Sequence, residues 1–140
     1  MKLVFATHNL NKVKEIKTLL PEHFELLSLT DIGCNEPIEE YGKTLEENAW
    51  IKARFVKMKY GLDCFADDTG LEVESLDGAP GVFSARYAGE EKNANNNMDK
   101  LMSELKNKDN RSAQFKTIIA LVYNGLETQF DGVVKGKIID

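Results

Sequence analysis

Residues 1–12 read MKLVFATHNLNK, and this stretch decides how the chain begins to fold. Residues 3–6 form a short apolar run typical of a buried strand, and apolar side chains at helical spacing begin at Val13. Asn9 lies between the two and suits the N-cap of the helix, because its carboxamide can accept from free backbone N–H groups. Lys12 then falls in the first helical turn, where the helix dipole disfavours a cation. Since strands that lead into a helix N-terminus often bind phosphate, we interpret Lys12 as part of an anion site.

The composition limits the class of protein. The 140 residues are 42% hydrophobic and 29% charged, which predicts a single globular domain over residues 1–140. The net charge of −5 argues against nucleic acid or an anionic membrane as a partner. Cys34 and Cys64 fit neither a metal-binding spacing nor a disulfide framework, and the sequence has no apolar run of membrane-spanning length. We therefore expect a cytoplasmic protein.

Strand and helix patterns alternate along the first half of the chain. The predicted strands cover residues 2–6, 24–29, 63–66, 71–76, 112–123 and 126–139. The predicted helices cover residues 9–20, 44–60 and 90–106. Asn124 and Gly125 join the last two strands and predict a type I′ hairpin turn. A strand–helix–strand opening followed by a hairpin indicates an α/β fold with a mixed sheet flanked by helices.

A second group of polar residues follows an apolar strand in the stretch FADDTGLEV, residues 65–73. Because side chains alternate along a strand, Asp67 and Asp68 should point to opposite faces and are poor partners for a shared dyad. The sequence Asp-Thr-Gly is also typical of a turn. Two acids that leave an apolar strand can nevertheless present a carboxylate to Mg²⁺.

A third group surrounds the start of the longest predicted helix. Glu39 and Glu40 precede this helix, and Lys52 lies two turns into it. Mg²⁺ typically takes one or two protein carboxylates and completes its shell with water and substrate phosphate. Glu40 and Asp68 could supply those carboxylates, while Lys12 and Lys52 neutralise phosphate groups. Taken singly, Glu39 and Glu40 also fit a solvated acidic loop, and Lys12 and Lys52 fit solvated positions of a helix.

In order along the chain, ATHNLNK, EEYGKTLEENAWIKA, FADDTGLEV, GAPGVFSARYAG and RSAQF resemble the inosine triphosphate pyrophosphatase family. Its members are also called non-canonical purine nucleoside triphosphate pyrophosphatases, and the resemblance covers residues 3–138. It implies an elongated, two-lobed α/β fold with a twisted mixed sheet and a central cleft, and it implies a homodimer. The implied reaction is the Mg²⁺-dependent conversion of NTP and water to NMP and pyrophosphate. A preference for ITP, dITP and XTP would remove deaminated purines from the nucleotide pool.

The resemblance also implies roles for single residues. The residues at substrate-binding positions of the family are Thr7, His8, Asn9, Leu10, Asn11, Lys12, Lys52 and Thr69. Glu40 and Asp68 occupy the positions of the family's Mg²⁺ ligands, and Asp68 also occupies the position of its proton acceptor. Whether Glu39 or Asp67 serves the metal as well is left open.

The family pattern continues after the hairpin with a Phe-Gly-Tyr-Asp segment and a Ser-His-Arg segment, and these 140 residues contain neither. We therefore expect the 140-residue form to bind pyrophosphate-like ligands with Mg²⁺ but to discriminate poorly between ITP and GTP. Two alternatives stay open at this point. One is a phosphatase that forms a phosphoaspartate at Asp-Thr-Gly, and the other is a nucleotide-binding sensor without turnover.

Overall fold

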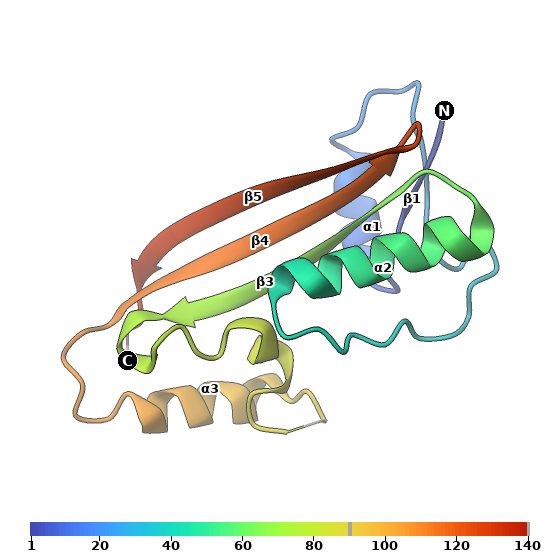
Figure 1. Ribbon diagram of the computed structural model, residues 1–140. Coiled ribbons are helices and arrows are strands. Elements are labelled where there is room, and N and C mark those ends of the chain that lie inside the picture. The colour runs from blue at the N-terminus through green and yellow to red at the C-terminus, as the bar shows by residue number, and fades with distance from the viewer. Residues whose placement is uncertain (90, 140) are drawn as a thin grey trace. The chain divides into compact units, whose positions relative to one another are not determined.

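The computed structural model describes residues 1–89 and 91–139. Its α-helices and strands, in chain order, are β1 (Lys2–Phe5), α1 (Leu10–Lys17), β2 (Glu25–Leu27), α2 (Leu45–Tyr60), β3 (Cys64–Val73), α3 (Ala94–Glu104), β4 (Ser112–Tyr123) and β5 (Leu126–Lys137) (Figure 1). Two 3₁₀ segments, η1 and η2, cover Glu74–Leu76 and Gly81–Arg86. Within the described residues, no helix has both the length and the apolar character needed to cross a membrane.

The strands form one sheet with the order β2-β1-β3-β4-β5. β1 is parallel to β2 and to β3, whereas β4 and β5 run antiparallel as a hairpin (Figure 1). The predicted α/β class with a mixed sheet is therefore confirmed.

Two compact units, each with a core of its own, make up the chain. The first comprises residues 1–42, 46–67 and 119–130, and the second comprises residues 43–45, 68–118 and 131–140. In the second unit, Val73, Leu101 and Leu105 form a buried cluster. The predicted single domain and the predicted central cleft stay predictions.

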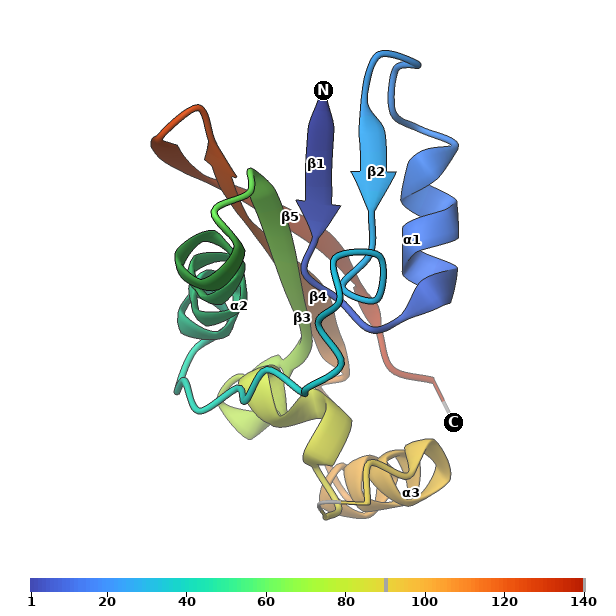
Figure 2. The same cartoon turned by 90° about the vertical axis from the view of Figure 1, so that its right-hand side faces the viewer.

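In the first unit, helices cover both faces of the parallel strands. Phe5 and Phe65 stack with their ring centroids 4.4 Å apart, and Phe5 packs against Val13 of α1. The Sγ atom of Cys64 donates to the carbonyl oxygen of Ala53 in α2 at 3.1 Å. Side chains alternate along a strand, so Cys64 and Phe65 face opposite sides of the sheet. α1 and α2 therefore lie on opposite faces (Figure 2).

The predicted beginning of α1 is confirmed. Asn9 is the N-cap, and its Oδ1 atom accepts from the backbone N–H groups of Asn11 at 3.0 Å and Lys12 at 3.2 Å. The helix ends at Lys17, three residues earlier than predicted. After the helix, the N–H groups of Leu19 and Leu20 both donate to the carbonyl oxygen of Ile16, at 2.9 and 3.2 Å, so the chain leaves the helix through a mixed 3₁₀ and α-type turn.

The prediction of two strands separated by an Asp-Thr-Gly turn is wrong. Residues 64–73 form the single strand β3, which lies between β1 and β4 in the sheet and pairs with β1 at Cys64 and Phe65. A Cβ atom on Gly70 would lie only 2.4 Å from the carbonyl oxygen of Gly81. Gly70 is therefore required for the close approach of another backbone segment within a strand. The prediction from turn chemistry missed this non-local contact.

The predicted hairpin turn is confirmed, because Asn124 and Gly125 both have positive φ, at 50° and 79°. Every residue of β5 is exposed, and the strand ends at Lys137, two residues before the predicted end. The third helix begins at Ala94 instead of residue 90, since Asn93 caps it by accepting from the N–H of Asn96 at 3.0 Å. Residue 90, the predicted start, lies outside the described residues.

Candidate active site

Two lysines from different helices meet at Asp67 of β3. The Nζ atom of Lys12 in α1 lies 3.1 Å from Oδ2 of Asp67. The Nζ atom of Lys52 in α2 donates to the main-chain oxygen of the same residue at 2.6 Å. The three residues belong to the first compact unit. Two cations that lie 40 positions apart in sequence are thus brought to one point at the sheet.

Lys52 also pairs with Glu40 in the loop before α2. Its Nζ atom lies 2.7 Å from Oε1 of Glu40, and the lysine side chain is only 14% exposed. Such a shielded ammonium interacts more strongly with nearby anions than a fully solvated one. Since an ammonium group has three N–H donors, Lys52 can hold a carboxylate, a carbonyl and one further acceptor together.

The predicted substrate loop, residues 7–12, forms the turn between β1 and α1. Oγ1 of Thr7 accepts from the N–H of Asn9 at 3.1 Å, and the cap at Asn9 fixes the first turn of the helix. Nε2 of His8 lies 2.9 Å from the carbonyl oxygen of Glu36. The side chains at the remaining two positions, Leu10 and Asn11, are exposed. The loop therefore combines a helix N-terminus with the ammonium of Lys12, an arrangement that suits an anionic ligand.

Asp68 and Thr69 follow Asp67 on β3 and belong to the second compact unit. Alternation along the strand points Asp68 away from the side chain of Asp67, and Oδ2 of Asp68 is buried. Thr69 is exposed, and its Oγ1 atom lies 2.8 Å from Oγ1 of Thr117 on β4. The sharing of one Mg²⁺ by Glu40 and Asp68 stays a prediction.

The residues present suit Mg²⁺ in their chemistry. Glu40 and Asp68 are carboxylates, and Mg²⁺ commonly takes one or two of them together with water and phosphate oxygens. Among the described residues, no group of three or more His, Cys, Asp or Glu side chains is placed to hold a metal by itself. Glu39 lines a groove beside Trp50 of α2, and whether it also serves a metal stays open.

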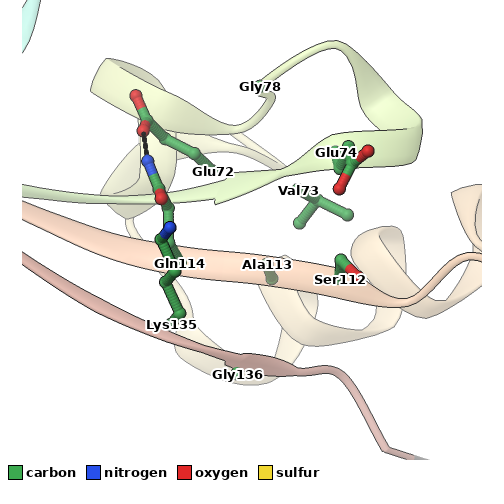
Figure 3. A pocket seen from close by; sticks show the side chains of 9 residues that line it. All are labelled: Glu72, Val73, Glu74, Gly78, Ser112, Ala113, Gln114, Lys135 and Gly136. Atoms are coloured by element: carbon green, nitrogen blue, oxygen red, sulfur yellow. Dashed lines mark hydrogen bonds between the residues drawn. The ribbon is translucent and has the colours of Figure 1, made fainter.

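A hollow of about 530 Å³ in the second unit contains none of the predicted site residues. Side chains from three strands line it, and Nε2 of Gln114 donates to Oε1 of Glu72 at 2.7 Å (Figure 3). Lys135 of β5 lies on the same hollow (Figure 3). Neither Lys12 nor Lys52 lines this hollow.

The cysteines do not offer a nucleophile. Both are buried, and burial raises the pKa of the Cys64 thiol to about 11, with a smaller opposing effect from Lys57. The reactive form of cysteine is the thiolate, so Cys64 stays in its unreactive form near neutral pH.

No site role was assigned from the sequence to two residues that make clear contacts near Lys12 and Lys52. Asp67 receives Lys12, and Asn48 of α2 is a polar side chain that is only 1% exposed. Asn48 lies one turn before Lys52, among buried apolar positions of the helix. A polar residue on the buried side of an amphipathic helix was the pattern that could have identified it.

The site and fold together define an α/β protein with paired lysines beside a strand–helix turn, a class suited to phosphate ligands. A family model described as the Ham1 family matches residues 3–140. The chain therefore belongs to the Ham1 family, and the predicted resemblance is confirmed.

Individual relatives support this membership. The chain is 62% identical over 140 residues to the dITP/XTP pyrophosphatase of Christiangramia forsetii and covers 74% of that protein. It is 60% identical over 139 residues to the dITP/XTP pyrophosphatase of Flavobacterium psychrophilum and covers 73% of it. Its fold matches the Staphylococcus aureus Ham1 protein with a TM-score of 0.92 and 35% identity, over 100% of this chain and 73% of the other. The prediction of an enzyme of the nucleoside triphosphate pyrophosphatase class is confirmed by these relationships.

Proposed function

We propose that this protein hydrolyses non-canonical purine nucleoside triphosphates, namely dITP, XTP and ITP, to the monophosphate and pyrophosphate. The relatives named dITP/XTP pyrophosphatase support this substrate class. Hydrolysis of these nucleotides would cleanse the nucleotide pool of deaminated purines. We also propose that the protein acts in the cytoplasm as a homodimer.

The observation that carries the proposal is the convergence of Lys12 and Lys52 on Asp67. Their Nζ atoms lie 3.1 Å from its carboxylate and 2.6 Å from its main-chain oxygen. A triphosphate brings several negative charges to a protein whose own net charge is −5. Because the overall field repels such a ligand, a few placed cations must hold it.

The side chains of this chain would divide the work of the reaction. Lys12 and the residues around the Asn9 cap would bind the outer phosphates, and Lys52 would neutralise charge as the bond to pyrophosphate breaks. Phosphoryl-type transfer depends mainly on positioning and electrostatic stabilisation, which such groups provide. Asp68 would orient the attacking water or accept its proton. Water supplies the oxygen that the new monophosphate gains, and pyrophosphate leaves.

The carboxylates of Glu40 and Asp68 would hold Mg²⁺. When bound, Mg²⁺ would act as a Lewis acid and neutralise phosphate charge. Glu40 already contacts Lys52 at 2.7 Å, so in the protein by itself the ammonium balances this carboxylate.

One alternative, the phosphoaspartate-type phosphatase, treats Asp-Thr-Gly as a phosphoaspartate motif and would release phosphate instead of pyrophosphate. In the structure these residues lie inside β3. The main-chain oxygen of Asp67 accepts from Lys52, and its carboxylate contacts Lys12. A nucleotide-binding sensor without turnover stays a second candidate, since the same lysines would serve binding alone.

The test is a product analysis of the purified chain with dITP, XTP, dGTP or dATP and Mg²⁺. We expect one monophosphate and one pyrophosphate for each dITP or XTP consumed. Pyrophosphate is identified because phosphate is released only after inorganic pyrophosphatase is added. Direct release of phosphate would contradict the proposal in favour of a phosphatase, and binding without any product would favour the sensor.

A further inference from the structure

Asn48 is a polar side chain buried in the first unit, and it contacts the loop that carries Glu40. It is 1% exposed, and its Oδ1 atom accepts from the backbone N–H of Gly42 at 2.7 Å. A buried carboxamide needs such partners, since an unpaired polar group is costly away from water. The bond therefore fixes Gly42 against α2.

Gly42 fits this position because it has no side chain. A Cβ atom there would lie 2.6 Å from Oδ1 of Asn48 and 2.6 Å from Cβ of Glu47. Both distances are shorter than real Cβ contacts, so any larger residue would push the loop away from the helix. The backbone of the loop thus lies directly on α2, and Asn48 is its point of attachment.

A second contact holds the same loop one helical turn further along. Lys52 follows Asn48 by four residues, so the two lie on one side of α2. Lys52 contacts the carboxylate of Glu40 at 2.7 Å, while Asn48 holds the backbone two residues later. The first contact is an ion pair that competing ions can weaken, whereas the second is a buried neutral hydrogen bond.

We propose that Asn48 is a positioning residue that holds Glu40 in place for the divalent cation of the substrate. The inference rests on the proposed function, in which Glu40 is a metal ligand. When a cation and phosphates compete for Glu40 and Lys52, their ion pair can no longer fix the loop. The bond from Asn48 to Gly42 does not involve these charges, so it keeps the carboxylate near its binding position throughout.

Asn48→Leu is the main test, because leucine is similar in size but has no hydrogen-bond acceptor. Mutation of a group that orients a metal ligand typically lowers metal affinity or activity by about 10–100-fold. We expect Asn48→Leu to raise by that factor the Mg²⁺ concentration that gives half-maximal pyrophosphate release. Gly42→Ala should give the same change, because it displaces the loop from the other side. Asn48→Asp keeps an acceptor oxygen, so its half-maximal Mg²⁺ concentration should lie close to that of the wild type.

Two measurements do not require turnover. Amide hydrogen exchange at Gly42 should be at least about tenfold faster in Asn48→Leu, since protection requires the bond to Asn48. Mn²⁺ binding, followed by electron paramagnetic resonance, should weaken in both loop variants. Val56→Ala is the matched control, because Val56 is fully buried on the same side of α2, two turns after Asn48. It should lower the melting temperature and leave Mn²⁺ affinity and Mg²⁺ dependence unchanged.

The outcomes separate this inference from the proposed function. If the wild type binds Mn²⁺ and releases no pyrophosphate, the proposed function fails, while weaker Mn²⁺ binding by the variants still supports the role of Asn48. If the folded Asn48→Leu and Gly42→Ala variants match Val56→Ala in both metal measurements, Asn48 is merely structural. Should Asn48→Leu not fold, Gly42→Ala and Asn48→Asp decide: Gly42→Ala with wild-type metal affinity overturns the inference.

Discussion

The ammonium of Lys52 lies 2.7 Å from the carboxylate of Glu40, so a residue implied to bind phosphate pairs with a residue implied to bind the metal. With no ligand bound, each charge balances the other. A triphosphate and its cation would replace this one pair with two, phosphate against Lys52 and cation against Glu40. Each charge of the original pair would then keep a counter-charge on binding, which lowers the cost of bringing an anion to an acidic protein.

Asp68→Asn should abolish most turnover and leave the fold intact. The change removes the implied proton acceptor while keeping the shape of the side chain, and loss of general-base catalysis typically costs about 10²–10⁴-fold in rate. Pyrophosphate release and the circular dichroism spectrum are the measurements. Asp77→Asn is the control, since Asp77 has a positive φ of 54°, a conformation that asparagine adopts readily. Near-normal activity of Asp68→Asn would refute the assignment.

Lys12→Ala should raise the KM for the triphosphate with little change in stability. The Lys12 side chain is 44% exposed, and substitutions at such positions usually alter the free energy of unfolding by less than about 0.5 kcal/mol. Steady-state kinetics and a urea melt check the two expectations. Lys14→Ala, at an exposed position of the same helix, is the control and should leave KM unchanged. An unchanged KM in Lys12→Ala would show that Lys12 does not contact phosphate.

Lys52→Ala should affect both substrate binding and stability. Its side chain is only 14% exposed, and it holds Glu40 and the main-chain oxygen of Asp67. Loss of hydrogen bonds from a charged group typically costs about 1.5–3 kcal/mol, so we expect a lower free energy of unfolding along with a raised KM. The small change in the free energy of unfolding that we expect for Lys12→Ala is therefore not expected for Lys52→Ala. A urea melt identical to that of the wild type would contradict this prediction.

Cys64 should resist thiol reagents in the folded protein, because burial raises its pKa to about 11. The unfolded chain ionises this thiol at its ordinary lower pKa. Above that value the unfolded state binds fewer protons than the native state, so stability falls as the pH rises toward about 11. The reactivity of Cys64 is measured by iodoacetamide labelling of a Cys34→Ala variant, in which Cys64 is the one remaining thiol. Rapid labelling at pH 8 without denaturant would contradict the prediction.

Gly125→Ala should destabilise the β4–β5 hairpin. Gly125 has a φ of 79°, and an L-residue in that conformation costs roughly 1–2 kcal/mol. The measurement is the free energy of unfolding in urea. Gly132→Ala on β5 is the control, because a Cβ there meets no atom within 4 Å. Equal effects of the two substitutions would show that the turn conformation is not the cause.

The sequence by itself determined the features that depend on neighbours along the chain. The cap at Asn9, the end of α2 before Gly61 and the turn at Asn124 and Gly125 follow from local hydrogen bonding and backbone preference. The ordered motifs likewise determined the family, since they carry the chemistry of a whole site. The mixed α/β class followed from the order of these local elements.

Tertiary structure decided the features that depend on distant segments. Asp-Thr-Gly lies in a strand because it is part of β3, which is hydrogen-bonded to β4 and whose Gly70 lies close to the backbone of Gly81. Such non-local contacts outweigh the local preference for a turn. Lys12 and Lys52 reach Asp67 because α1 and α2 cover opposite faces of the same parallel strands. The role of Asn48 depends on a backbone N–H six residues earlier, which only packing of the loop on α2 brings to its side chain. Local sequence sets backbone preferences, whereas contacts between distant side chains exist only after the sheet has formed.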